Sequence, residues 1–432
     1  MKNKKKSNTL YACVTWILAV VIFFIEYLIR VSPSSMISEL MYSFKANNLQ
    51  ISSFSAFFMY AYVIMQIPVG IIVDKYGSKN SIVISAFLYA INTYIFASTS
   101  NLLVAQISRF FLGLTGAFAF IGILKLCVNW FSKKTFPILV GLTQSVGMVG
   151  GALGSGIMGR LVKEYGWRNS LEIFSLAMFI CILLVILFVK DKPASLSGKD
   201  HLLKKRVDVV IGLKKILNNK QTWLIAIISG LIYIPTGVLA ELWGSFYLIN
   251  VKEFSSIDST DAISVIFIGW SIGGPLFGLI SNIIGRKSTI LIGIINNMVT
   301  LPVVLYCPIE NHIVICILFF IYGLLNSSSI VCYTAISEQY EKNIQGTALG
   351  FANALSVLIS AIFQQLIGFV IDLIRQERII NNFNDYIPSE IKLSMLLIIF
   401  STFISLAIFF FIVETISRLR ARKDSNLRPP GS

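Results

Sequence analysis

Gly70–Lys79 reads GIIVDKYGSK and Gly278–Lys287 reads GLISNIIGRK, so two segments 208 positions apart share their glycine spacing and a basic ending. A second set of matching residues lies in two apolar stretches that are related by almost the same offset, 209 positions. Its members are Gly141 with Gly350, Gln144 with Asn353, and Gly159 with Gly368. Agreement between two separate places indicates that the chain is a tandem repeat.

The composition of the 432 residues is that of an integral membrane protein. Hydrophobic residues make up 56% and charged residues 13%, whereas a soluble protein has about 45–50% apolar and about 25% charged residues. The net charge of +15 would suit a protein that binds nucleic acid, but the basic residues form short clusters between long apolar runs. We therefore expect a lipid bilayer, and not nucleic acid, as the partner of this chain.

Twelve apolar stretches are long enough to cross a bilayer, which takes about 20 helical residues. They occupy 10–31, 50–73, 80–99, 102–129, 136–160, 170–189, 221–249, 261–283, 288–307, 312–335, 346–373 and 391–415. With the repeat, this pattern predicts an all-α fold of 12 transmembrane helices in two pseudo-symmetric six-helix bundles, with a substrate site between them. The predicted parts are an N-terminal bundle (1–189), a basic cytoplasmic linker (190–220), a C-terminal bundle (221–417) and a cytoplasmic tail (418–432).

The positions of Lys and Arg predict the orientation, because positive residues are retained on the cytoplasmic side. With both termini inside, the cytoplasmic segments hold 25 of the 36 basic residues and the outer segments hold eight. The opposite orientation would invert this bias. We therefore expect both termini in the cytoplasm, and the inner (plasma) membrane of a bacterium as the location.

The two repeated segments resemble the loop motif of the major facilitator superfamily of secondary transporters. That motif is Gly-x-x-x-Asp-(Arg/Lys)-x-Gly-Arg-(Lys/Arg). The first copy departs from it at Ser78, and in the second copy Asn282 replaces the acidic residue. The run Arg109-x-x-x-Gly113-x-x-x-Ala117 resembles the second motif of the family. The resemblance covers nearly the whole chain and implies transport by alternating access, with a cavity lined mainly by helices one, four, seven and ten.

Three shorter segments resemble the phagosomal nutrient transporters of intracellular bacteria, a group within that superfamily. They are Arg30–Ser34 (RVSPS), Leu242–Gly244 (LWG) and Gly346–Ala348 (GTA). This narrower likeness implies the import of amino acids or other small nutrients.

The loop motif predicts a gate between the two bundles. Asp74 closes a span at the cytoplasmic face, where a carboxylate can meet the positive N-terminus of a neighbouring helix. Gly70 and Gly77 allow a helix or loop backbone to approach closely. The alternative is a simple positive anchor at that face. The predicted gating residues are Gly70, Asp74, Lys75, Gly77, Lys79, Gly278, Gly285, Arg286 and Lys287.

Five ionisable residues within or at the edge of spans are candidates for substrate binding or coupling, because a charge in hydrocarbon is costly without a partner or water. They are Glu26, Arg30, Arg109, Lys125 and Glu241. Glu26 and Arg30 stand four apart and share a helical face. Arg109 lies roughly 12 Å below the outer end of its span and Lys125 is rotated roughly 160° from it, so we favour Arg109 over Lys125. The alternatives are snorkelling of Arg30 and Lys125 to the interface and structural pairing of the others.

Glu241 is the deepest of these carboxylates. Pro235-Thr236-Gly237, directly before it, is expected to bend or loosen the helix because Pro removes a backbone hydrogen bond. Broken helices at membrane depth commonly border transport sites. The repeat offset places Glu241 within about three residues of the position of Arg30, which suggests the hypothesis of an outer ion pair between the two halves.

The sequence therefore predicts a secondary transporter that imports a small polar nutrient, coupled to protons or another ion. Three basic against two acidic span residues favour a substrate with at least one carboxylate. A zwitterionic amino acid fits, with Arg109 or Arg30 holding its carboxylate. Glu26 or Glu241 would then serve the amine or the proton.

Other functions are alternatives to this one. Within the transporter class, the alternative is an organic-anion carrier or an exporter of a siderophore or drug. From a different class, it is a non-transporting receptor with the same fold. We expect no enzymatic activity, because the sequence has no nucleophile–base arrangement, metal-ligand cluster or GxxxxGK loop. We also expect no cofactor and no metal, and a monomeric protein.

Overall fold

The structure, a computed structural model, describes residues 2–131, 136–191, 209–341, 344–379 and 388–414. Every regular element within these ranges is a helix. Eleven helical segments of the described residues have the length and composition of a membrane span, and the remaining predicted span, 50–73, falls within the 29-residue helix α3. The all-α membrane fold predicted from the sequence is confirmed.

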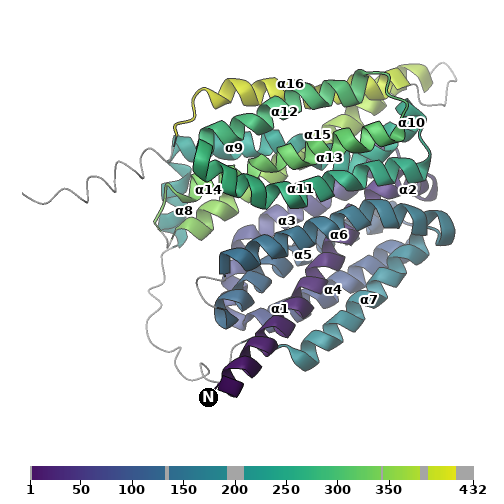
Figure 1. Ribbon diagram of the computed structural model, residues 1–432. Coiled ribbons are helices and arrows are strands. Elements are labelled where there is room, and N and C mark those ends of the chain that lie inside the picture. The colour runs from purple at the N-terminus through teal and green to yellow at the C-terminus, as the bar shows by residue number, and fades with distance from the viewer. Residues whose placement is uncertain (1, 132–135, 192–208, 342–343, 380–387, 415–432) are drawn as a thin grey trace, which may run out of the picture.

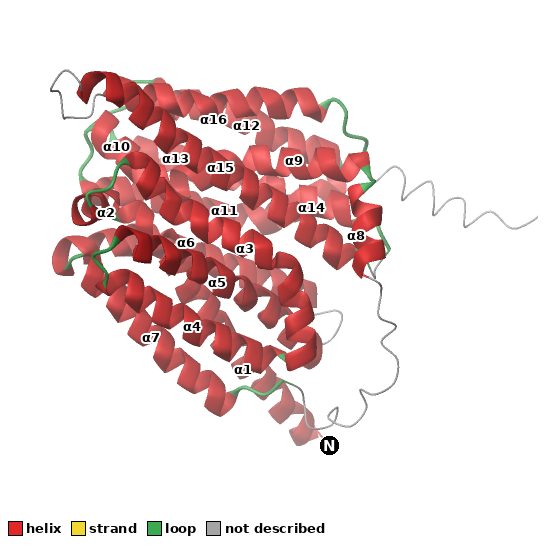
Figure 2. Cartoon of the chain, turned by 180° about the vertical axis from the view of Figure 1, so that it is seen from behind, coloured by secondary structure: helices red, strands yellow, loops and turns green. Residues whose placement is uncertain are grey.

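The long helices divide between two halves of the molecule. Those of the first half are α1 (Lys2–Val31), α3 (Asn48–Tyr76), α4 (Ser78–Ser98), α5 (Leu102–Trp130), α6 (Phe136–Tyr165) and α7 (Trp167–Phe188). Those of the second half are α9 (Lys220–Pro235), α11 (Ser256–Ile284), α12 (Arg286–Tyr306), α13 (His312–Asn326), α15 (Gln345–Ile379) and α16 (Pro388–Phe409). The two groups occupy the lower and upper parts of Figure 1, and the view from behind in Figure 2 shows the same division.

Shorter helices continue or connect these long ones. They are η1 (Ser32–Ser35), α2 (Ile37–Phe44), α8 (Val209–Leu217), η3 (Thr236–Trp243), α10 (Gly244–Lys252), η4 (Ser327–Ser329) and α14 (Ile330–Ser337). Most of the predicted linker and all of the predicted tail lie outside the described residues, so the domain boundaries at 189/190, 220/221 and 417/418 stay a prediction.

The seventh predicted span is interrupted at its centre. The helix α9 ends at Pro235, and the next eight residues form the π-helix η3 before α10 continues. The N–H of Thr236 bonds the carbonyl of Tyr233, so it does not serve the carbonyl of Ile232. Two amide side chains do so instead, Asn297 at 3.1 Å and Asn326 at 3.0 Å. The break expected from Pro235 is present, and side chains of α12 and α13 satisfy its backbone.

The two halves contact each other mainly along two helix pairs, α3 with α15 and α6 with α11. The helices of each pair run antiparallel. The start of α3 lies beside the later part of α15 at Gly368, and the later part of α6 at Gly159 lies beside Thr260 near the start of α11. The end of these pairs at which α3 begins is called the Asn48 end below. The end that holds both copies of the loop motif is called the motif end.

Glycines on these four helices are closely packed against the other half at the Asn48 end and have open space beside them at the motif end. A Cβ atom on Gly159 of α6 would lie 2.6 Å from the hydroxyl of Thr260 of α11. A Cβ atom on Gly368 of α15 would lie 2.8 Å from the carbonyl oxygen of Asn48 of α3. At the motif end, a Cβ would meet no described neighbour within 4 Å at Gly70, Gly141, Gly278 and Gly350.

Candidate functional site

An ion pair joins the two halves of the molecule near its centre. The guanidinium Nη2 of Arg30, at the end of α1, lies 3.0 Å from Oε1 of Glu241 in η3. The same carboxylate oxygen accepts a hydrogen bond of 2.7 Å from the hydroxyl of Tyr233. The two side chains are 8% and 2% exposed, so the charges are almost completely removed from solvent. The structure contains the ion pair that the repeat offset suggested.

Aromatic rings surround the Arg30 guanidinium. Its central carbon lies 5.0 Å from the ring centroid of Tyr27, 5.6 Å from that of Phe58 and 5.5 Å from that of Tyr62. Cations are attracted to such ring faces, most strongly where water is excluded. The first ring comes from α1 and the other two from α3, so the first half of the chain builds the cage and the second half supplies the carboxylate.

The pair leaves hydrogen-bonding capacity unused. Within the described part of the chain, neither Oε2 of Glu241 nor Nε of Arg30 has a hydrogen-bond partner. A guanidinium and a carboxylate can form two parallel hydrogen bonds, and here they form one. The cation is therefore neutralised by a single contact, and a carboxylate that approached it squarely would bind it better.

Arg109 of α5 points its guanidinium at backbone carbonyls of neighbouring helices. Its Nε donates to the carbonyl of Phe54 at 3.1 Å, and its two Nη atoms donate to those of Ile29 at 3.5 Å and Arg30 at 3.1 Å. Because α1 gives way to the 3-10 turn η1 after Val31, these last carbonyls need donors from outside the helix. Arg109 is 1% exposed, and in this structure it supports the backbone that carries Arg30.

Glu26 of α1 lies beside a separate small cavity within the first half. The cavity has a volume of about 10 Å³, about the size needed for one water molecule. Its lining includes Tyr89, Thr115 and Gly116. A Cβ on Gly116 would lie 2.7 Å from Oε1 of Glu26, so glycine makes the room for this carboxylate. Oε2 of Glu26 has no partner among the described residues.

Lys125 lies on α5, sixteen residues beyond Arg109 toward the motif end, and is partly buried. Of the five candidates from the sequence, the structure thus brings together Arg30 and Glu241, and sets Arg109 directly behind Arg30. Glu26 occupies its own cavity. These positions leave the transport role of each residue a prediction.

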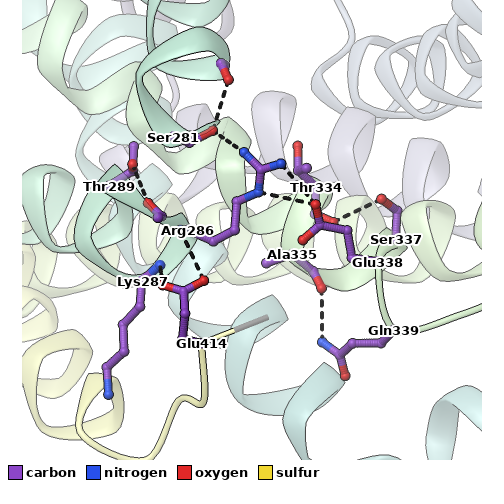
Figure 3. A network of polar contacts seen from close by, with 12 residues as sticks. Ser281, Arg286, Lys287, Thr289, Thr334, Ala335, Ser337, Glu338, Gln339 and Glu414 are labelled. Atoms are coloured by element: carbon purple, nitrogen blue, oxygen red, sulfur yellow. Dashed lines mark hydrogen bonds and ion pairs between the residues drawn. The ribbon is translucent and has the colours of Figure 1, made fainter. Parts of the chain in front are cut away.

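The loop motifs are built alike in the two halves. Gly77 and Gly285 have φ angles of +86° and +95°, which side chains rarely tolerate, and each joins two long helices. Beside them, Oδ1 of Asp191 accepts from the backbone N–H of Lys79 at 2.7 Å. Glu414 accepts likewise from two successive backbone N–H groups, those of Arg286 at 3.2 Å and Lys287 at 2.9 Å (Figure 3). Each carboxylate therefore caps a helix N-terminus in its own half.

The basic residues of the motifs also make contacts inside their own halves. Lys79 and Lys287 donate to the carbonyls of Ile186 and Ile412, each at 2.7 Å. Arg286 pairs with Glu338 at 2.9 Å, and Figure 3 shows its guanidinium between Glu338 and Ser281. Asp74 and Lys75 have side chains outside the described part of the structure, so the gate predicted for Asp74 stays a prediction.

Some contributors to the site lay outside the sequence-based prediction. Tyr233, Tyr27 and Tyr62 belong to apolar stretches that are rich in aromatic residues, and nothing in their spacing marks them. Asp191 follows the sixth span, and Glu414 lies at the end of the twelfth predicted span, so each comes a few residues after the last helix of its half ends at Phe188 or Phe409. Because an acidic residue occurs after the last helix of both halves, the sequence could have indicated these two helix caps.

Comparisons with known proteins agree with this geometry. The sequence model described as Major Facilitator Superfamily matches residues 16–364. The cis,cis-muconate transport protein of Acinetobacter baylyi is 24% identical over 82% of this chain and 88% of its own length. The Escherichia coli protein named "Probable galactarate/D-glucarate transporter GarP" is 24% identical over 76% and 82%. The crystal structure of a bacterial homolog of the human lysosomal transporter Spinster, inward-facing and unoccupied, superposes with a TM-score of 0.78 at 13% identity, covering 93% of this chain and 96% of its own.

Proposed function

This chain belongs to the Major Facilitator Superfamily and is a secondary transporter, and from that premise we propose that it imports a small organic acid together with protons. The observation that carries the proposal is the Arg30–Glu241 pair. It is the one ion pair between described side chains that is almost completely buried and that also joins the two halves. It sits beside a broken helix, as transport sites commonly do.

The proposed binding step is an exchange of carboxylates on Arg30. In the structure Arg30 has one hydrogen bond to Glu241, at 3.0 Å, and an Nε without a described partner. A substrate carboxylate that forms two parallel hydrogen bonds with the guanidinium makes a stronger contact than the one it replaces. Arg109, which holds the backbone carbonyl of Arg30, keeps the cation in place during the exchange.

The exchange supplies the coupling to protons. Once the substrate occupies Arg30, Glu241 loses its cation in a place where its side chain is 2% exposed. A buried carboxylate without a counter-ion is costly to keep charged, so Glu241 binds a proton. One proton then accompanies each substrate carboxylate that Arg30 binds. Glu26, buried beside its own cavity, is the candidate for a second proton.

The substrate class follows from the charge of the site and from the relatives. The matched relatives are named for muconate and for galactarate or D-glucarate, which carry carboxylates and no amine. We therefore place organic acids ahead of amino acids. The amino acid predicted from the sequence is the alternative, and it would use Glu26 or Glu241 for its ammonium group.

The conformational cycle follows from the difference between the two ends. The halves are packed through Gly159 and Gly368 at the Asn48 end, and the glycines at the motif end have open space beside them. Taking the motif end as cytoplasmic, as the Lys and Arg bias predicts, this is the conformation that releases substrate inside. In the opposite conformation we propose that Gly70, Gly141, Gly278 and Gly350 let the halves close at the motif end. Working as a monomer in a bacterial inner membrane, with both termini in the cytoplasm, the protein would take up its substrate from outside.

The test is uptake by the purified protein in proteoliposomes, with and without an imposed pH gradient. The panel contains labelled muconate, glucarate and a hexuronate beside amino acids. We expect uptake of an organic acid that rises when the outside is more acidic. Arg30→Lys, which keeps the charge and loses the planar fork, should raise the apparent KM at least tenfold, whereas the exposed Arg160→Lys should not. Uptake of amino acids alone, or wild-type KM in Arg30→Lys, would overturn the proposal.

A further inference from the structure

A carboxylate of the second half caps a helix of the first half at the Asn48 end. Asp372, near the end of α15, accepts three hydrogen bonds from the start of α3. Its Oδ1 accepts from the backbone N–H of Asn48 at 3.2 Å and from the Nδ2 of the same residue at 2.6 Å. Its Oδ2 accepts from the backbone N–H of Leu49 at 2.8 Å.

This contact completes the first turn of α3. The first N–H groups of any helix have no partner within the helix. In α3 the side chain of Asn47 satisfies the N–H of Gln50 at 2.8 Å, in a capping box. The two N–H groups before it, those of Asn48 and Leu49, are satisfied by Asp372 from the other half of the molecule. A negative carboxylate at this position also interacts favourably with the positive end of the helix dipole.

The surroundings of Asp372 hold the two helices close together at this end. Gly368, one turn earlier on α15, packs on the carbonyl of Asn48. A further turn back, Gln365 accepts from the hydroxyl of Tyr60 of α3 at 2.6 Å. Another charged contact between described side chains of the two halves at this end, Arg160 with Asp261, has side chains that are 51% and 29% exposed, and such surface pairs contribute little. Of these two contacts, the one at Asp372 is the stronger tie, because its carboxylate accepts three hydrogen bonds from the start of α3.

We propose that Asp372 is the latch that favours closure of the Asn48 end, a role separate from binding of substrate or proton. Opening that end separates α3 from α15, so the Asp372 carboxylate must leave the N-terminus of α3 in each cycle. The sequence predicts a carboxylate latch at Asp74, at the other end of α3. The structure shows this type of contact at the opposite end of α3, where α3 supplies the helix N-terminus and α15 supplies the carboxylate.

The proposal is tested by measuring how accessible each end of the molecule is. The full chain, with its six native cysteines replaced, carries one reporter cysteine at a time. Thr260→Cys is the reporter for the Asn48 end, because Thr260 is 1% exposed and packs on Gly159. Gly350→Cys is the reporter for the motif end, where the structure is open. The rate of maleimide labelling is measured in detergent without any substrate.

When Asp372→Ala is added, maleimide should label the Asn48-end reporter about tenfold faster and the motif-end reporter more slowly. A tenfold shift in the equilibrium between the two conformations corresponds to about 1.4 kcal/mol. Asp372→Asn, which keeps the shape and loses the charge, should change both rates in the same directions by less, and serves where the alanine variant does not fold. The matched control is Asn47→Ala, which removes the cap that α3 makes for itself and leaves Asp372 in place. It should alter neither rate.

Three results would overturn the latch. One is an unchanged labelling rate of the Asn48-end reporter in both Asp372 variants. Another is faster labelling of both reporters, which means a loosened fold and not a shift between two conformations. The third is an equal effect of Asn47→Ala, which means fraying of α3. The inference rests on the proposed alternation between two conformations. It does not depend on the identity of the substrate or on protons, so its failure would leave the uptake assay unaffected.

Discussion

Replacing Glu241 with Gln should separate proton coupling from substrate movement. The amide oxygen of Gln can still accept hydrogen bonds from Arg30 and Tyr233, which lie 3.0 Å and 2.7 Å from Oε1 of Glu241. The variant therefore keeps the polar contacts of the buried site. It cannot gain or lose a proton, so it corresponds to a permanently protonated carboxylate. We expect exchange of substrate across the membrane to continue, and accumulation driven by a pH gradient to fall.

The expected decrease in substrate accumulation depends on how many carboxylates carry a coupled proton. Each coupled proton lets a gradient of one pH unit support a tenfold concentration ratio, because one pH unit corresponds to about 1.36 kcal/mol. If Glu241 is the sole carrier, the ratio falls from about 10 in the unaltered protein to about 1 in Glu241→Gln. If Glu26 carries a second proton, the ratio falls from about 100 to about 10. Both cases predict a tenfold loss.

The assay compares counterflow with gradient-driven uptake in the same proteoliposomes, with the membrane potential held at zero. Glu310→Gln is the matched control, because Glu310 is exposed in a loop between spans and its loss should leave both activities unchanged. Full accumulation by Glu241→Gln would show that Glu241 is not the coupling residue. Glu26→Gln would then be measured in the same way, and full accumulation there too would refute coupling through a membrane carboxylate.

Further predictions concern the supports of the site and the gate. Arg109→Lys loses two of three contacts to carbonyls and should lower the free energy of unfolding without substrate by about 1–3 kcal/mol; an unchanged melting temperature would contradict its supporting role. Gly350→Leu fills open space at the motif end, so it should slow uptake at least tenfold without loss of thermal stability, and a normal rate would argue against closure there. Glu414→Gln weakens the cap of α12 and should lower the free energy of unfolding by up to about 1 kcal/mol while KM stays constant. Asp74→Asn should impair transport in protein that is normally inserted, and unchanged uptake would refute a latch at that residue.

The arrangement of spans could be predicted from the sequence because it depends on length and composition alone. About twenty apolar residues must cross as a helix whatever their order, and an offset of 208 or 209 positions reveals the repeat. The ion pair of Arg30 with Glu241 could be predicted from the sequence for a related reason. The repeat places the two residues at corresponding depths in the two halves, and an isolated charge at that depth needs a partner.

The orientation of a buried side chain could not be predicted in this way. Arg109 satisfies the same rule as Arg30, being a cation deep in a span, but its partners are the carbonyls of Ile29, Arg30 and Phe54. Backbone carbonyls carry no sequence signature, and those near the end of α1 become available only because η1 follows it. The same limit applies to Asp372, whose partners are mainly backbone N–H groups of a helix more than 300 positions away.

The helix that carries Asp372 also positions the π-helix of the site. The side chain of Gln364 on α15 donates to the carbonyl of Gly237 at 2.7 Å, and its backbone carbonyl accepts from Trp243 at 3.0 Å. These two contacts hold η3 near its beginning and at its end, on either side of Glu241. A movement of α15 away from α3 therefore displaces the Glu241 carboxylate relative to Arg30, which belongs to the other half.

Among the described residues, the two halves are thus tied by the buried pair of Arg30 with Glu241 and by the part-buried contact of Asp372 with the start of α3 at the Asn48 end. A ligand changes the balance between two conformations only through its different affinity for each. In the proposed mechanism that difference originates at Arg30, where a substrate carboxylate takes the place of Glu241 and Glu241 then binds a proton. In the same mechanism, loading of both substrate and proton removes the central ion pair, while the Asp372 contact and the packing at Gly159 and Gly368 still favour closure of the Asn48 end. Loading with one of the two leaves an unpaired buried charge, either Arg30 or Glu241, and that cost opposes movement of the proton without the substrate.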